Sequence, residues 1–217
     1  MRKFIAGALI AGATLPLLAG VATAASHSNP SPDAGGRQAK CATGVDARLA
    51  ELTKLDRAVA AAKHLADGHR TTITSNNAAA RSGLTDLKAK IAADTDDATR
   101  KADCKSVVVD YRVSALRAPQ EHLVIAADAE SAAIAKLQGL GGKVPAELQA
   151  KVADAATQIN GLADAVLATT PADYNANHDV LKASRASVKA AAADLKEVRA
   201  GMKAAKPPKP EKKAPKK

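Results

Sequence analysis

Aromatic side chains are almost absent from this 217-residue chain, which has no tryptophan, two tyrosines and one phenylalanine. Phe4 lies in the apolar N-terminal run, so Tyr111 and Tyr174 are the only tyrosine, tryptophan or phenylalanine residues after it. Hydrophobic residues still make up 47% of the sequence, and alanine is prominent among them. Because alanine buries little area, we expect a thin core between closely packed elements. The shortage of stacking surfaces argues against single-strand nucleic-acid binding and against a sugar-stacking platform. We also expect no sequence-specific nucleic-acid partner.

Long hydrophobic runs are also missing after the first twenty residues. The chain opens with Arg2 and Lys3, continues with an apolar run over residues 4–19, and then reads Ala22-Thr23-Ala24. A short basic region, an apolar core and a small-x-small site are typical of a secretory signal peptide. The alternative is an uncleaved anchor, although the run is shorter than the roughly 20 apolar residues of a membrane span. We expect cleavage before Ala25, no transmembrane span afterwards, and a secreted protein in the medium or on the cell wall.

Signatures of catalysis and metal binding are missing as well. The sequence contains no HExxH, GxSxG, P-loop or GxGxxG pattern. His64 and His69 are spaced differently from the i, i+4 pair that places two ligands on one helix face. Of the five histidines, only His122, close to Pro119, is worth testing, and a hydrogen-bonded structural role is favoured for it. We expect no enzymatic activity, no catalytic residue, no metal site and no cofactor.

The chain has only two cysteines, Cys41 and Cys104. Outside the cytoplasm, two such residues are more often paired with each other than free or metal-bound. A redox role would require a close CxxC-like pair, which the sequence lacks. We therefore predict a Cys41–Cys104 disulfide, which would stabilise the fold by roughly 4 kcal/mol in the chain-entropy model.

The net charge of +10 is concentrated at the C-terminus. Residues 206–217 hold six lysines and one glutamate, together with prolines and no apolar anchor, so we expect a disordered tail. Clustered lysines attract polyanions by releasing counterions, and wall polymers, acidic lipids, extracellular DNA and glycosaminoglycans are candidates. The alternative is a solubilising tail that binds nothing. The candidate binding residues are Lys206, Lys209, Lys212, Lys213, Lys216 and Lys217.

Apolar residues between the termini recur at steps of three and four, the spacing of one helix face. Short turns between long periodic segments favour antiparallel neighbours. We predict an all-α, up-down bundle of about five long amphipathic helices with coiled-coil character. The first and third helices would then start at the same end, where the two cysteines could pair. The predicted helices run from Gly44 to Ala66, from Arg70 to Ala92, from just after Asp97 to Leu137, from Pro145 to before Thr170, and from Thr170 to Ala205.

Three local features of these helices are predicted in detail. Pro119 disfavours the helical conformation of the preceding residue, so we expect a kink or break near Ala118. Asn77 falls on an apolar seam, where it either fixes the helix register or lies at a solvated end. Thr170 is a predicted helix N-cap, with Asp173 in the capping-box position. In the last helix, a heptad seam is formed by Tyr174, Leu181, Val188, Leu195 and Met202.

Two segments resemble a group of secreted, alanine-rich helical proteins of actinobacteria. They comprise residues 102–107 (ADCKSV), 110–113 (DYRV), Pro119 and 122–128 (HLVIAAD), and then 171–178 (PADYNANH). The resemblance implies a helical fold and secretion, and it assigns no functional residues. The Lys/Pro/Ala tail resembles the C-terminal arm of mycobacterial heparin-binding haemagglutinin, which follows a coiled-coil body.

The domain organisation and function follow from these features. We expect a non-enzymatic secreted or envelope-associated protein whose basic tail binds anionic polymers. The alternative is an extracellular protein-binding or self-associating helical module with an incidental tail. The predicted parts are a signal peptide at 1–24, a flexible leader at 25–40, a helical bundle domain at 41–205 and the tail at 206–217.

Overall fold

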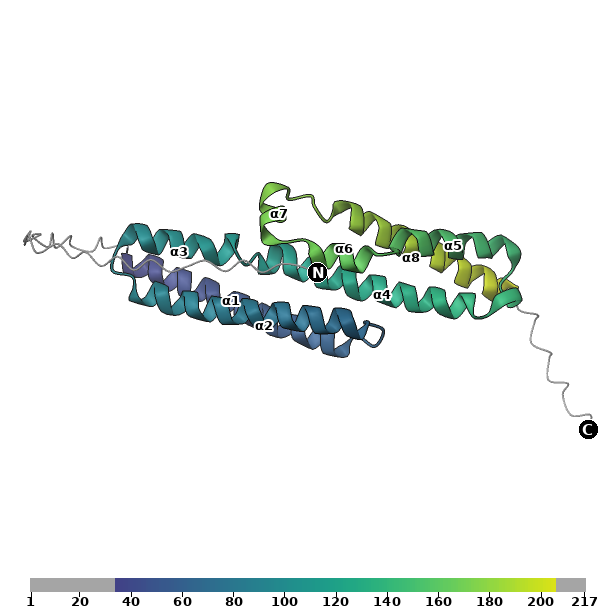
Figure 1. Ribbon diagram of the computed structural model, residues 1–217, viewed down its shortest axis with the longest axis horizontal. Helices are drawn as coiled ribbons and strands as arrows, with labels where there is room; N and C mark the ends of the chain where they lie inside the picture. Colours follow the sequence, from purple (N-terminus) through teal and green to yellow (C-terminus); the bar gives the residue numbers. More distant parts are fainter. Residues whose placement is uncertain (1–33, 206–217) are drawn as a thin grey trace, which may run out of the picture. The chain divides into compact units, whose positions relative to one another are not determined.

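The computed structural model describes residues 34–205, and the signal-peptide, early leader and tail predictions lie outside this range. The described residues form helices and no strand, which confirms the all-α prediction for that part of the chain. The elements (Figure 1) are α1 (Ala34–Ala61), α2 (Asp67–Ala93), α3 (Asp97–Val109), the π turn η1 (Val113–Arg117), α4 (Ala118–Gln138), the 3₁₀ turn η2 (Gly141–Lys143), α5 (Ala146–Ile159), α6 (Leu162–Ala168), α7 (Pro171–Ala176) and α8 (Lys182–Ala204).

Helices α1 and α2 pack as an antiparallel pair. The ion pairs Asp46–Lys88 and Asp56–Arg81 establish the direction, because the residue numbers rise along α1 while they fall along α2. At the turn between them, the Arg70 guanidinium donates to the carbonyl oxygen of Val59 and, at 2.7 Å, to that of Ala62. Each of these carbonyls also accepts a backbone N–H, from Ala62 and Leu65 respectively, so Arg70 adds a second bond to each at the turn. Helix α1 ends here at Ala61, earlier than the periodicity predicts.

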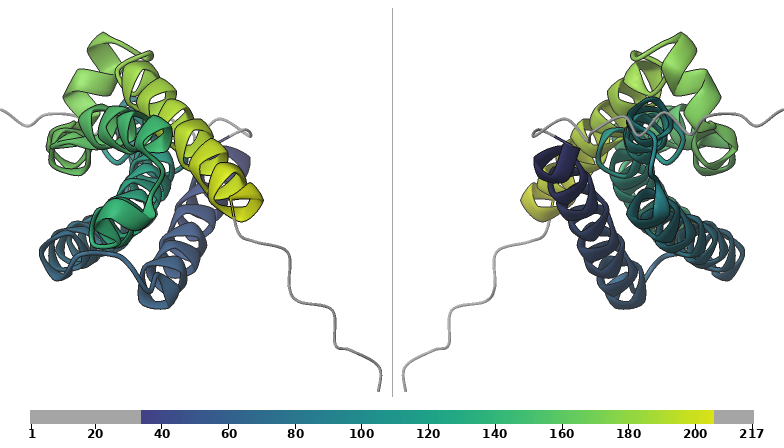
Figure 2. Two further views of the ribbon diagram at one scale, coloured as in Figure 1. Left: turned by 90° about the vertical axis from the view of Figure 1, so that its right-hand side faces the viewer. Right: turned by 90° about the vertical axis from the view of Figure 1, so that its left-hand side faces the viewer.

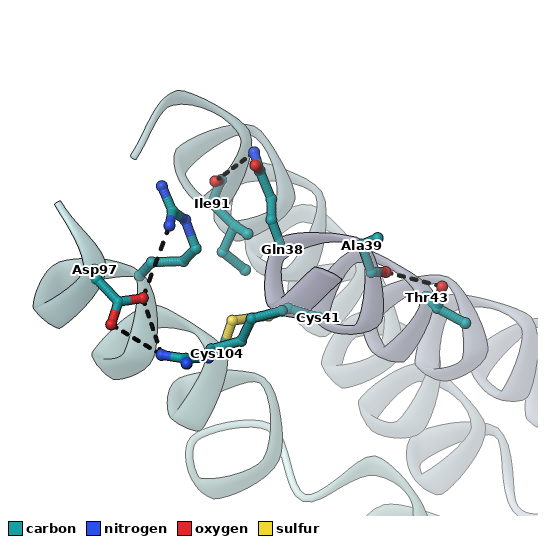
Figure 3. Close-up of a disulfide and its surroundings, with 9 residues drawn as sticks. Gln38, Ala39, Cys41, Thr43, Ile91, Asp97 and Cys104 are labelled. Carbon is teal, nitrogen blue, oxygen red and sulfur yellow. Dashed lines mark hydrogen bonds and ion pairs between the residues drawn. A yellow bond between two sulfur atoms is a disulfide. The ribbon is translucent and has the colours of Figure 1, made fainter. Parts of the chain in front are cut away.

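The predicted disulfide joins Cys41 of α1 to Cys104 of α3, with the two Cα atoms 5.6 Å apart (Figure 3). The first and third helices therefore start at the same end, as expected. Nearby, Arg37 Nη1 donates to both carboxylate oxygens of Asp97 at 2.9 Å. The Gln38 amide donates to the carbonyl oxygens of Ile91 and Ala92 at 3.2 Å, which ties α1 to the end of α2.

These contacts also explain where α1 begins. The periodicity predicts a start near Gly44, after a flexible leader at residues 25–40, but the helix begins at Ala34. The segment 34–43 has no apolar stripe of the kind that predicts a helix, and its long-range partners include Asp97 and Cys104 in α3 and the end of α2. Tertiary contacts therefore extend the helix where local sequence signals do not.

The third predicted helix is interrupted upstream of Pro119. Helix α3 ends at Val109, and Arg112 adopts a left-handed backbone conformation with φ of 43°. The π turn then leads directly into α4, and the Ala118 N–H bonds to the Val113 carbonyl. Pro119 lies in the first turn of α4, where an N–H is not required. The expected break near Ala118 is therefore replaced by a break around Arg112.

The last two predicted helices are interrupted as well. Gly161, with φ of 65°, separates α5 from α6, because glycine adopts this conformation without a steric penalty. Between α7 and α8 the chain is extended at Asn177, so the predicted heptad seam is not one continuous helix. The predicted capping box is confirmed, since Thr170 and Asp173 exchange side-chain and backbone hydrogen bonds.

Three apolar clusters hold these elements, and the segment from α3 through η1 to α4 contributes to each of them. At the third of these clusters, helix α8 packs against both α5 and α4 (Figure 2). The first cluster includes Val45, Leu52, Leu84, Ile91, Val107 and Val113. The second includes Val59, Leu65, Ile73, Leu116, Leu123, Val124, Ala127, Leu162, Val166 and Leu181. The third includes Ile134, Leu137, Val152, Ala155, Ile159, Ala191, Leu195 and Val198.

Gly83 provides the first test of this packing, because a Cβ built there would lie 2.4 Å from the Tyr111 hydroxyl oxygen. We expect Gly83→Ala to be less stable than Gly68→Ala by about 1–3 kcal/mol in urea unfolding. Gly68 is the matched control in the same helix, since it has nothing within 4 Å. In a Tyr111→Ala background the penalty at Gly83 should disappear, and its persistence would show that Tyr111 does not cause it.

The disulfide gives a second prediction. Its half-cystines are 63 residues apart in sequence, so a Cys41→Ser/Cys104→Ser double variant should lose roughly 4 kcal/mol of unfolding free energy. Adding dithiothreitol should destabilise the native protein and leave the double variant unchanged. Mass spectrometry of the unreduced protein should find no alkylatable thiol, and detection of two free thiols would contradict the pairing.

Candidate functional site

The structure places the residues that the sequence singled out in different surroundings. Cys41 and Cys104 are brought together as a disulfide. The six tail lysines and His27 lie outside the described residues. His122, the histidine of interest, is exposed on α4. Buried ionisable groups gather in two other places. One is a polar cavity near η1, and the other surrounds a different histidine, His69.

The polar cavity has a volume of about 240 Å³ and lies between α2, the η1–α4 junction and the α6–α7 connection. Its position next to a π turn is typical of functional sites, because such turns redirect side chains out of the regular helical pattern. Exposed residues Asn76 and Thr170 lie on its lining, so the cavity reaches the surface. The lining residues are Ile73, Asn76, Asn77, Leu116, Arg117, Gln120, Glu121, Leu167, Thr169, Thr170 and Pro171.

Two polar residues of this lining are almost completely buried. Asn77 is 1% exposed and Glu121 is 4% exposed. The Asn77 amide donates to Asp56 Oδ1 at 3.0 Å, and Asp56 also pairs with Arg81 at 2.6 Å. Of the two interpretations of Asn77 from the sequence, a solvated helix end is excluded by this burial. A polar residue on a buried seam, bonded across to α1, matches the register-fixing interpretation.

Three buried polar atoms around this cavity lack a hydrogen-bond partner. They are Asn77 Oδ1, Glu121 Oε2 and Arg117 Nε. By contrast, the Gln120 amide nitrogen has two partners, since it donates to the carbonyl oxygens of Val166 and Thr169 at 2.7 Å. Gln120 thereby holds the end of α6 against α4 and fixes one wall of the cavity.

Burial dominates the electrostatics of the cavity. It raises the pKa of Glu121 to about 7, with the Asp56 carboxylate adding to the rise, while a hydrogen bond with Asn77 and the charge of Arg117 oppose it. Burial also lowers the pKa of the Arg117 guanidinium, which the charge of Glu121 counteracts. Glu121 is therefore a buried carboxyl that changes its protonation state near neutral pH.

The short helix α7 begins at Pro171, on the lining of this cavity, and Arg112 anchors it. Arg112 Nε donates to Asn175 Oδ1 at 2.6 Å, and the Asn175 amide donates to the Val109 carbonyl at 3.1 Å. The Arg112 guanidinium also lies 5.3 Å from the centre of the Tyr174 ring, a cation–π contact. The left-handed backbone of Arg112 thus directs a side chain that anchors α7 to the break between α3 and η1.

His69 forms a second polar cluster, with two carboxylates. Its Nδ1 lies 2.9 Å from Asp128 Oδ2, and its Nε2 lies 3.1 Å from Asp164 Oδ1. Asp128 Oδ2 also accepts the Ala66 N–H at 2.8 Å, so it caps the start of α2, whose own N-cap side chain makes no such bond. The cluster joins α2, α4 and α6. Desolvation opposes protonation of His69, but the bonds to Asp128 and Asp164 outweigh it and raise its pKa.

Within residues 34–205, no group of three or more histidine, cysteine, aspartate or glutamate side chains is placed to hold a metal ion. Over the same range, no helix is both long enough and apolar enough to cross a membrane.

Comparisons of the chain with protein-family models, with curated proteins and with solved structures give no match. The resemblance to actinobacterial secreted proteins accordingly stays a prediction. The structure does bring together the two segments that carry it, through Arg112 of the first and Tyr174 and Asn175 of the second. Arg117, one of the cavity residues, lies between the parts of the first segment.

Of the three cavity residues that have an unpartnered polar atom, Asn77 was singled out from the sequence, and Arg117 and Glu121 were not. Asn77 was recognisable because a polar residue interrupts an apolar seam. Arg117 and Glu121 are charged residues four apart, a spacing that usually indicates a solvated helix face. His69 and Asp128 are 59 residues apart, so no local pattern links them.

A third prediction concerns His69. NMR titration should give His69 a pKa above 6.5 in the native protein, and Asp128→Asn should lower it more than Asp164→Asn, because Asp164 is 81% exposed and more screened by solvent. Since folding raises this pKa, the stabilising contribution of the cluster is complete below pH 6.5 and is lost as the pH rises through the native pKa. Urea unfolding of His69→Gln and wild type should therefore differ more at pH 5.5 than at pH 8.5. An unchanged difference would contradict this assignment.

Proposed function

We propose that the protein is a non-enzymatic secreted or cell-envelope-associated protein whose basic tail binds anionic polymers. The observation that carries the proposal is the distribution of charge. Residues 206–217 hold six lysines and one glutamate, which is half of the net charge of +10. A lysine cluster of this density neutralises several anionic groups at once and releases their counterions.

The helical body supports this division of roles, because many of its cations are already paired. Arg81 and Lys88 of α2 pair with carboxylates of α1. Lys151 of α5 lies 2.5 Å from Glu197 and 3.8 Å from Asp194, both in α8. In this proposal the body is an up-down bundle with coiled-coil-like seams that carries the tail. The Cys41–Cys104 disulfide supports an oxidising location such as the extracellular space.

The second candidate is a protein-binding or self-associating helical module with an incidental tail. It has less support, because a partner helix would require an apolar face. Among the described residues, Val108 is the one large hydrophobic side chain that is exposed, at 43%. Sedimentation at several concentrations tests the self-associating form of this candidate, since self-association requires a mass that rises with concentration.

A fourth prediction tests the tail. The full chain should bind a heparin column and elute with salt, whereas deletion of residues 206–217 should abolish retention. If all six lysines make contact, affinity should fall about 1,000-fold between roughly 50 and 200 mM salt, by analogy with duplex DNA.

Two matched variants separate charge from chain stiffness. Replacing the six lysines with glutamine keeps the tail length and should abolish retention. Replacing Pro207, Pro208, Pro210 and Pro215 with alanine keeps the charge and should leave retention unchanged. Undiminished retention of the glutamine variant would overturn the proposal.

A further inference from the structure

The cavity beside η1 has chemistry that the tail proposal does not use. Asn77 and Glu121 are each more than nine-tenths buried, and each has an oxygen atom without a partner. Buried polar atoms in folded proteins are almost always paired, either with another protein group or with ordered water, and a ligand can take the place of that water. Unpartnered atoms gathered at one cavity therefore point to something that binds there.

The polarity of these atoms restricts what fits. Asn77 Oδ1 and, when Glu121 is ionised, Glu121 Oε2 are acceptors and require donors, whereas Arg117 Nε is a donor and requires an acceptor. An anion alone would leave the two acceptors unpaired, and a cation alone would leave Arg117 Nε unpaired. A molecule with an ammonium group and a carboxylate group satisfies all three, with the ammonium supplying three donors.

We propose that this cavity binds a small zwitterion, a free α-amino acid with a small aliphatic side chain. The ammonium group bonds to Glu121 and Asn77, and the carboxylate bonds to Arg117. Ile73, Leu116 and Leu167 supply an apolar wall for the side chain. The volume of about 240 Å³ lies just below the range of pockets for drug-sized ligands, which suits a molecule of this size.

Protonation of Glu121 gives the site a characteristic pH dependence. An ammonium ligand requires the carboxylate form, and burial raises the pKa of Glu121 to about 7. The groups that face Glu121 are Asn77 of α2, Asp56 of α1, which pairs with Arg81, and Arg117. Affinity should therefore rise with pH, by up to about tenfold per pH unit below the pKa and less above it.

The test is isothermal titration calorimetry of the full chain at pH 8. The probes are glycine, L-alanine and L-valine, and each is compared with the acid and the amine that lack one of its two charged groups. At least one amino acid should bind saturably, and its matched acid and amine should bind at least tenfold more weakly. If no probe binds, the cavity holds water only and the proposal is wrong. Equal binding of a matched acid or amine would also overturn it.

Variants locate the site. Arg117→Lys keeps the charge and removes Nε, and Glu121→Gln keeps the shape and removes the carboxylate, so each should weaken binding at least tenfold. Glu147→Gln, at an exposed carboxylate outside the cavity, is the matched control and should bind normally. Unchanged binding by both Arg117→Lys and Glu121→Gln would overturn the assignment.

A blocking variant covers the case in which buried substitutions unfold the protein. Asn76→Trp changes an exposed rim residue and should exclude the ligand, whereas Thr72→Trp, also exposed and one turn earlier in α2, should not. Full binding by Asn76→Trp would contradict the location. Deleting residues 206–217 should leave amino-acid binding intact, so this proposal and the tail proposal can fail separately.

Discussion

The fold depends on one helical path, which runs from α3 through the π turn into α4. All three apolar clusters take residues from this path, from Val107 in the first cluster to Leu137 in the third. Because the side chains are small, each cluster requires its helices to approach closely. The contact of Tyr111 with Gly83 shows this directly, since even a methyl group at residue 83 would overlap the ring. A shift in this path would therefore disturb every cluster.

The break at Arg112 sets the position of the later elements. A left-handed residue other than glycine is uncommon and usually carries a structural or functional role. Here it aims a guanidinium at Asn175 and Tyr174, and α7 is held where the chain leaves α3. The π turn that follows places Arg117 at the cavity, and the first turn of α4 places Glu121 there. The interruption of the helix and the polar cavity are thus two consequences of the same local geometry.

Buried polar groups are unusual in such a thin core, and here they lie where helices from different parts of the chain meet. Asp128 bonds to both Ala66 and His69, which secures the start of α2 against α4. Glu121 and Asn77 have no such complete set of partners. The contrast is informative, because Asp128 is satisfied within the protein, whereas Asn77 and Glu121 each keep a buried oxygen atom without a hydrogen-bond partner.

The sequence by itself determined the features that depend on neighbouring residues. Helical periodicity, the buried seam containing Asn77 and the Thr170–Asp173 capping box were all predictable, since each rests on spacings within a few turns of one helix. The disulfide was predictable because only two cysteines occur. Tertiary structure decided the start of α1, the break at Arg112, the pairing of His69 and the cavity around Glu121. Each of these depends on contacts between residues that are distant in sequence, such as Arg37 with Asp97 or Arg112 with Asn175. Such contacts contribute more free energy than the weak local preference of a short segment for helix or turn.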